Sequence, residues 1–126
     1  MVKTSISEIS YLTSTQLTEV SCVACTINST KIAAQKATEL LLLIPNWQLH
    51  NRDNIMLLER EYTFKNYKLA WDFANKISVM AETEGHHPAI LLEWGKVTVT
   101  WWTHTINGLH QNDFICAAKT DALFSK

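Results

Sequence analysis

The chain has 126 residues and a mass of 14.4 kDa, a length that suits one folded domain and leaves little room for two. Hydrophobic residues make up 47% of the sequence and charged residues 18%, so the chain can bury a core and does not resemble a disordered protein. The net charge of -1, without a visible cluster of Lys and Arg, argues against a nucleic-acid-binding surface.

The sequence also carries no membrane or secretion signal. Its longest apolar run, Leu40 to Pro45, is far shorter than the roughly 20 residues that a bilayer-spanning helix needs, and the N-terminus lacks the apolar stretch of a signal peptide. The 3 cysteines cannot all pair within one chain, which fits a reducing compartment better than a secreted disulfide scaffold. We therefore expect a cytoplasmic protein.

The N-terminal part of the chain divides into an extension and a helix. Residues 1–29 are rich in Ser and Thr, and their apolar residues are too scattered to predict an element, so we treat them as an extension preceding a single domain at 30–126. A helix is expected to begin at Ser29 or Thr30, either of which can cap it, and to stop at Pro45.

A hairpin and a long helix are expected next. Trp47–His50 and Ile55–Thr63 have the composition of strands, and the polar residues 51–54 between them predict a turn. From 65 to 84, apolar and aromatic residues recur at steps of three and four, which predicts an amphipathic helix. Its expected buried stripe comprises Phe64, Tyr67, Trp71, Ala74, Ile77 and Ala81.

The long helix is expected to end at a corner between Gly85 and Pro88. Residues 89–94 and 96–104 then predict a second hairpin with a tight turn around Gly95, and a last helix follows from about Gln111 to Leu123. The order helix, two strands, helix, two strands, helix predicts an α+β domain. Its sheet should have four largely antiparallel strands, with helices packed on one face.

The last strand alternates with a period of two, so its residues divide between the two faces of the sheet. One set is Val97, Val99 and Trp101, and the other is Lys96, Thr98, Thr100, Trp102 and His104. The helices are expected to cover the valine face. This would place Trp102 and His104 on the uncovered polar face, at the end of the strand.

Several chemically suggestive residues have simpler interpretations. Cys22 and Cys25 form a CxxC pair, but the strand–helix context of a redox pair and the second cysteine pair of a structural zinc site are both missing. We expect no catalytic role for them, with weak metal or redox chemistry as the alternative. His50 and His110 are solitary, so a structural or solvated role is expected, for His110 near the N-cap of the last helix.

His86 and His87 stand side by side at the corner, where helix capping would explain one imidazole but hardly two. One functional interpretation is a metal site with His104 and Glu82, although adjacent residues at a turn rarely aim both rings at one ion. The other is general acid–base catalysis, because imidazoles with a pKa of about 6.5 both donate and accept protons at neutral pH. Acid–base catalysis demands less of the geometry.

These residues belong to an ordered series that resembles pterin-4a-carbinolamine dehydratase. The resemblance covers roughly residues 30 to 124, and Trp47 matches a tryptophan that family members carry near the pterin pocket. A lone His-His-Pro would be a weak signal, whereas the whole spaced series is specific. The series consists of Glu82, His86, His87, Pro88, Trp94, His104 and Asp113.

The resemblance implies a sheet whose uncovered concave face and rim bind a reduced pterin, in a homodimer or homotetramer. The implied reaction removes water from a 4a-hydroxytetrahydropterin and yields a quinonoid dihydropterin, which is recycled to the cofactor of aromatic amino acid hydroxylases. The resemblance implies no metal and no bound cofactor.

Dehydration requires one proton delivered to the leaving hydroxyl and one removed from nitrogen, which imidazoles around a flat ring can divide between them. We expect His86 and His104 to be this acid–base pair, His87 to hold or polarise the pterin, and Glu82 to orient an imidazole. Aromatic walls and the corner complete the expected binding set, which adds Trp47, Trp102 and Pro88.

One departure and one alternative accompany the resemblance. Gly85 stands where animal members of the family usually have Asp. Some animal members also serve as dimerisation cofactors for a homeodomain transcription factor, and some relatives without catalytic function assist assembly of a photosynthetic enzyme, so a partner-binding scaffold is the alternative. Retention of the histidines together with Glu82 favours the enzyme, because a scaffold does not need them.

Overall fold

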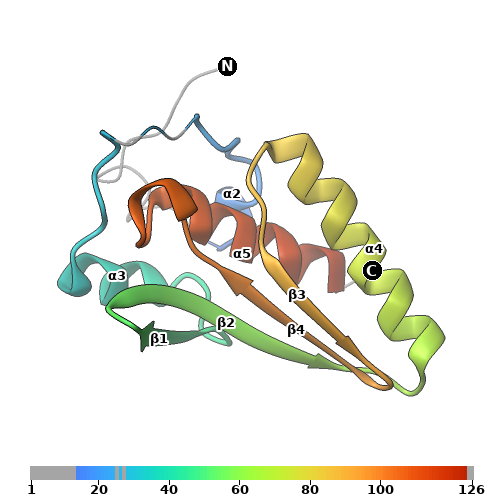
Figure 1. The fold of residues 1–126 in the computed structure, drawn as a ribbon. Coiled ribbons are helices and arrows are strands. Elements are labelled where there is room, and N and C mark those ends of the chain that lie inside the picture. Colours follow the sequence, from blue (N-terminus) through green and yellow to red (C-terminus); the bar gives the residue numbers. More distant parts are fainter. Residues whose placement is uncertain (1–13, 25, 27, 125–126) are drawn as a thin grey trace.

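The computed structural model describes residues 14–24, 26 and 28–124 (Figure 1). Its strands are β1 (Gln48–Arg52), β2 (Ile55–Thr63), β3 (Ala89–Glu93) and β4 (Lys96–Trp101). Its helices are α2 (Ser14–Leu17), α3 (Ala34–Leu41), α4 (Tyr67–Glu84), the 3-10 helix η1 (His104–Ile106) and α5 (Gln111–Phe124). The predicted α+β order is confirmed, and α2 is an additional element within the extension.

The four strands form one antiparallel sheet in the order β1-β2-β4-β3. Helices α4 and α5 lie side by side behind this sheet (Figure 1), and α3 precedes β1 along the chain. The central strands β2 and β4 are therefore covered on one face, as the sequence predicted.

The core lies between the sheet and the two long helices. Val97, Val99 and Trp101 of β4 are fully buried, and so are Leu58 and Tyr62 of the neighbouring strand β2. The indole Nε1 of Trp101 donates to Thr120 on α5, so the largest buried side chain has its polar atom satisfied. The predicted covering of the valine face is confirmed.

The two hairpins turn by different means. Asp53 and Asn54 both have positive φ, 53° and 65°, which gives the tight two-residue turn that suits the twist of paired strands. At the other hairpin the backbone of Gly95 approaches Phe64, whose N–H donates to the Gly95 carbonyl at 2.8 Å. A Cβ on Gly95 would lie 3.0 Å from the Phe64 carbonyl oxygen, so glycine permits this close contact.

Helix α3 begins later than the sequence predicted. Neither Ser29 nor Thr30 caps it, because Ala33 is extended and the helix starts at Ala34. The N–H of Ile32 instead donates to the carbonyl of Leu109 at 2.8 Å, and the Ile32 side chain is buried. This contact with a distant segment holds the chain extended where the local pattern favoured a helix.

The buried stripe of α4 also differs from the expectation. Tyr67 and Trp71 are each 47% exposed, and the buried residues are Ala70, Phe73, Ala74, Ile77 and Ala81. Tyr67 is the first residue of α4 and Trp71 lies one turn after it, so both rings follow the helical period but remain largely outside the core. Among the described residues, no helix combines the length and apolar character needed to cross a membrane.

Candidate active site

The corner after α4 is created by a single left-handed residue. Gly85 has φ 67° and ψ 27°, its N–H donates to the carbonyl of Glu82, and the N–H of His86 reaches back to Ala81 at 3.2 Å. These bonds end the helix in the manner common for glycine and turn the chain sharply. The turn directs His86 inward, toward the start of α5.

Replacing Gly85 by alanine is expected to lower the free energy of unfolding by about 1 kcal/mol. Alanine resists a positive φ, while no atom beyond the adjoining chain lies within 4 Å of the position that its Cβ would occupy, so the loss would report backbone strain. Equilibrium urea denaturation measures the loss. Gly85→Asn should cost less, because Asn and Asp adopt this conformation more readily, and an equal loss in both variants would contradict the explanation.

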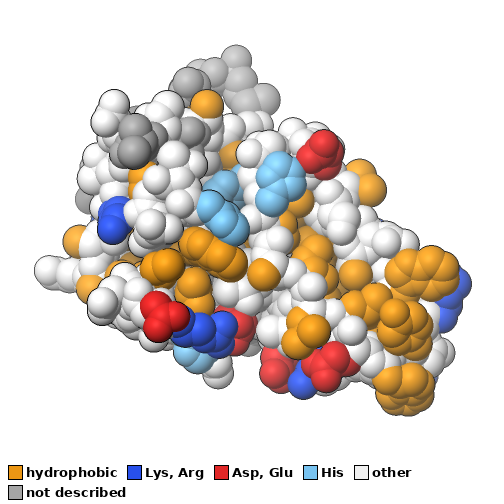
Figure 2. Space-filling model, viewed as in Figure 1, with side chains coloured by type: hydrophobic (Ala, Val, Ile, Leu, Met, Phe, Trp, Pro, Cys, Tyr) orange, Lys and Arg blue, Asp and Glu red, His pale blue; other side chains and the backbone are white. Residues whose placement is uncertain are grey.

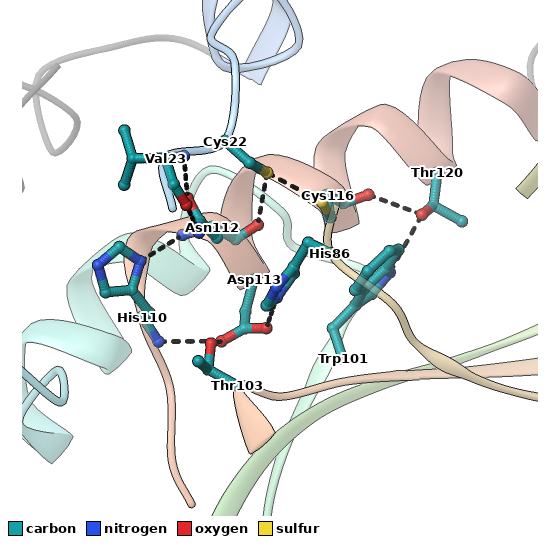
Figure 3. Close-up of polar contacts among 10 residues, drawn as sticks. All are labelled: Cys22, Val23, His86, Trp101, Thr103, His110, Asn112, Asp113, Cys116 and Thr120. Atoms are coloured by element: carbon teal, nitrogen blue, oxygen red, sulfur yellow. Dashed lines mark hydrogen bonds and ion pairs between the residues drawn. The ribbon is translucent and has the colours of Figure 1, made fainter. Parts of the chain in front are cut away.

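His86 is held in a buried, ordered position. Its side chain stacks on Trp101, with ring centroids 5.6 Å apart and an interplanar angle of 8°, and the residue is only 9% exposed. Its Nε2 lies 2.6 Å from Oδ1 of Asp113 (Figure 3). An imidazole bound to a carboxylate through Nε2 has a defined orientation and tautomer, which leaves Nδ1 as the nitrogen that can exchange a proton.

Asp113 is the residue on which this arrangement depends. It has no exposed surface, and besides His86 it accepts hydrogen bonds from the Thr103 hydroxyl at 2.7 Å and the His110 N–H at 2.9 Å. The last bond also caps α5, because the third helical residue accepts from the residue that precedes the helix. Asp113 belongs to the spaced series that marks the family, but the sequence analysis assigned it no role.

His110 completes the cap from the other side. Its Nδ1 accepts the N–H of Asn112 at 3.2 Å, so the neutral imidazole takes the place of the usual polar cap, as the sequence suggested. Burial lowers the pKa of His110, and the nearby His86 adds to this effect, while the charge of Asp113 opposes it. The folded protein therefore favours the neutral form that the cap requires.

This lowered pKa predicts a pH dependence of stability. Above about pH 6.5 His110 is neutral in both the folded and the unfolded states. As the pH falls below that value, the unfolded chain binds a proton that folded His110 resists, so stability is lost until the lower folded pKa is reached. The melting temperature of His110→Asn, which keeps a capping acceptor, should fall less steeply than that of wild type; equal slopes would exclude His110 as the cause.

His87 and His104 lie nearer the surface. The Nε2 atom of His87 is 2.8 Å from Oε1 of Glu82, so the expected orienting carboxylate does contact an imidazole. His104 does not belong to β4 as predicted, because that strand ends at Trp101 and His104 begins η1. Its ring stacks on Trp102, with centroids 4.2 Å apart.

The three histidines meet at one cavity of about 330 Å³. It lies at the end of the sheet, where β4 stops and β3 begins, and Figure 2 shows histidine side chains gathered at the surface there. The cavity lining consists of Val23, Gly85, His86, His87, Thr103, His104, Thr105 and Asn112. Of these, Val23, Thr103, Thr105 and Asn112 were not selected from the sequence, because they come from segments that only the fold brings together.

Four expected site residues do not line this cavity. Trp102 and Glu82 lie behind His104 and His87, respectively, and Pro88 follows the histidine pair. Trp47 is 3% exposed, and its Nε1 donates to Asp121 at 3.0 Å, so its indole is part of the core and has no surface to offer this cavity.

Comparison with known proteins identifies a family. The family model "Pterin 4 alpha carbinolamine dehydratase" matches residues 30–123. The chain belongs to this family. A Photobacterium profundum protein whose name provisionally assigns it to pterin-4-alpha-carbinolamine dehydratase is 58% identical over 105 residues, which make up 83% of this chain and 94% of that protein.

Two solved structures share the fold. A Brucella melitensis protein described as a transcriptional coactivator/pterin dehydratase aligns with a TM-score of 0.68 and 28% identity, over 75% of this chain and 98% of its own. A pterin dehydratase-like protein identified as a RuBisCO assembly factor in the alpha-carboxysome aligns with a TM-score of 0.54 and 24% identity, over 62% and 88%. At that identity the second likeness concerns the fold alone.

The alternative of a metal site finds no support in the geometry. Within residues 14–24, 26 and 28–124, no group of three His, Cys, Asp or Glu side chains is arranged to hold a metal ion. The ring nitrogens of His86 and His87 contact different carboxylates, of Asp113 and Glu82, rather than a common point. Cys25 of the CxxC pair lies outside the described residues.

Proposed function

We propose that this protein removes water from a 4a-hydroxytetrahydropterin and forms a quinonoid dihydropterin by histidine acid–base catalysis. Membership of the pterin-4a-carbinolamine dehydratase family supports the reaction. The observation that carries the mechanism is that His86, His87 and His104 line one cavity although they come from two separate segments. Two segments can present proton-exchanging groups to different edges of one flat ring.

His86 and His104 are the proposed proton carriers. The Asp113 carboxylate fixes His86 through Nε2, so proton exchange at Nδ1 does not require the ring to reorient. His104 is exposed, its ring makes no hydrogen bond with a described residue, and stacking on Trp102 supports it from one face. One of the two protonates the leaving hydroxyl at C4a and the other removes the proton from N5.

His87 is proposed to hold the pterin, with Glu82 behind it. Both side chains are largely exposed, 61% for His87 and 82% for Glu82, so their contact alone adds little stability. Such a pair instead orients the imidazole toward a ligand. Asp113 is proposed to orient His86 in the same way.

The proposed product links the protein to aromatic amino acid hydroxylation, because reduction of the quinonoid dihydropterin restores the tetrahydropterin that such hydroxylases use. A homo-oligomer is also proposed. Large apolar side chains gather at the end of the molecule near the β3–β4 turn (Figure 2), and Trp94 is 70% exposed. Exposed apolar patches of this kind favour association.

The alternative is a partner-binding scaffold of the same fold. The likeness to the RuBisCO assembly factor raises it, but only at the level of fold. The three histidines at one cavity favour catalysis, because a scaffold does not need proton-exchanging groups from two segments to line a common cavity.

Stopped-flow absorbance tests the proposal directly. A hydroxylase generates 4a-hydroxytetrahydropterin in situ, and its decay is followed with and without the purified full chain. We expect the protein to accelerate the decay. A folded wild-type protein that leaves the spontaneous rate unchanged would refute the enzymatic proposal and favour the scaffold.

A further inference from the structure

Residues 14–24, here called the N-terminal segment, are bound firmly to the domain, although the sequence suggested a mere extension. Leu17 is fully buried in the core. Lys119 on α5 donates to the carbonyl of Thr18 at 2.8 Å, and the N–H of Cys22 donates to Oε1 of Glu84 on α4 at 2.9 Å. Contacts from both long helices therefore position Cys22.

The same segment forms one wall of the histidine cavity. The Val23 N–H donates to Oδ1 of Asn112 at 2.9 Å, and the Asn112 amide returns a bond to the Val23 carbonyl at 2.6 Å (Figure 3). Val23 lines the cavity, and Asn112 precedes the Asp113 that holds His86. Any bond that fixes this segment also fixes part of the cavity wall.

Two thiols meet where the segment crosses α5. The Sγ atoms of Cys22 and Cys116 lie 3.2 Å apart, and the Cys22 thiol also lies 3.8 Å from the carbonyl of Asn112 (Figure 3). A disulfide needs an S–S distance of about 2.05 Å, so a small side-chain adjustment brings the atoms within bonding range. We propose that Cys22 and Cys116 form a reversible disulfide that locks the N-terminal segment onto α5.

The chemistry requires a low-molecular-weight disulfide, such as oxidised glutathione, as the oxidant. The thiolate of the partly exposed Cys22 attacks one sulfur of this disulfide, which forms a mixed disulfide and releases one thiol. Cys116 then attacks Sγ of Cys22 and releases the second thiol, to which its proton passes. Two cysteine thiols are thus oxidised by two electrons while one small disulfide is reduced to two thiols.

Burial makes this bond selective. Cys116 is fully buried, and its hydrogen bond with Cys22 together with burial raises the pKa of its thiol, so it remains protonated and inert toward solvent reagents. Cys116 therefore reacts only with a sulfur already beside it. Cys22, the more exposed of the two, is the thiol that reacts first with the small disulfide.

Equilibration of the full chain in glutathione buffers from reducing to oxidising, followed by alkylation and non-reducing peptide mapping, tests the proposal without reference to enzymatic activity. We expect a peptide linked through Cys22 and Cys116 in wild type and in Cys25→Ser, and none in Cys22→Ser. The two cysteines lie 94 positions apart, so the oxidised protein should melt about 10 °C higher than the reduced protein. Exchange of the Val23 amide hydrogen should slow by about tenfold or more.

Three results would overturn the proposal. These are a Cys22–Cys25 disulfide in wild type, a lasting glutathione adduct on Cys22, and unmodified thiols in the most oxidising buffer. Cys22→Ser changes a partly exposed residue, so this variant should fold. The absence of the linked peptide in this variant would therefore not be caused by unfolding. Its circular dichroism provides the control.

Discussion

Alanine at either His86 or His104 is expected to lower turnover of 4a-hydroxytetrahydropterin by about 10²-fold or more, the usual scale for loss of a general acid or base. Both side chains line the cavity, and each is proposed to move one of the two protons of the dehydration. The His86→Ala/His104→Ala double variant should fall to the spontaneous rate. Stopped-flow absorbance with matched enzyme concentrations measures each loss.

Two further variants separate catalysis from folding. His86→Gln keeps an N–H donor for the buried Asp113 but cannot exchange a proton, so its turnover should fall as far as that of His86→Ala. His50→Ala changes a histidine on β1, outside the cavity, and should retain wild-type turnover. A folded His104→Ala protein with near-normal turnover would remove His104 from the mechanism.

Replacing Asp113 by alanine is expected to lower the free energy of unfolding by about 3–5 kcal/mol. The carboxylate is fully buried and accepts hydrogen bonds from a side-chain nitrogen of His86, from Thr103 and from the backbone of His110. Its removal leaves these donors unpaired inside the protein and takes the cap from α5. Equilibrium urea denaturation measures the loss.

Asp72 offers a matched control on a helix surface. Its carboxylate pairs with Lys68 one turn away at 2.8 Å, and both side chains are substantially exposed, so Asp72→Ala should cost less than about 1 kcal/mol. Asp113→Asn, which keeps the shape and one acceptor, should lose less than Asp113→Ala. Similar losses at Asp72 and Asp113 would show that the buried network does not stabilise the domain as described.

Local pattern was sufficient for most of the fold. Strand β2 spans Ile55–Thr63, the range predicted, because its composition and the polar turn that precedes it mark a strand clearly. The predicted start of α3 was wrong because the backbone of Ile32 forms a hydrogen bond with Leu109. The residues near Ile32 in the sequence give no sign of this contact. The exposure of Tyr67 and Trp71 was missed for a related reason: a helical period shows that one face is apolar, but not which turns of that face meet the sheet.

The sequence selected the histidines that line the cavity, but not the residues that hold them in position. The corner histidines and His104 could be selected from residue chemistry and from the spaced series that marks the family. Asp113 lies 27 positions from His86, and a hydrogen bond across that separation depends on where α5 packs. Trp47 was expected at the site because it matches a tryptophan of the family. In the structure it lies in the core and donates a hydrogen bond to Asp121.

The sequence by itself determined the order of the main elements, the face of the sheet that is buried and the choice of candidate histidines. These depend on side-chain chemistry and short-range periodicity. Only the tertiary structure decided which carboxylate holds which histidine, and that Val23 and Cys22 lie against α5. Those contacts join residues far apart along the chain, and their geometry is set by the packing of whole helices on the sheet rather than by local preference.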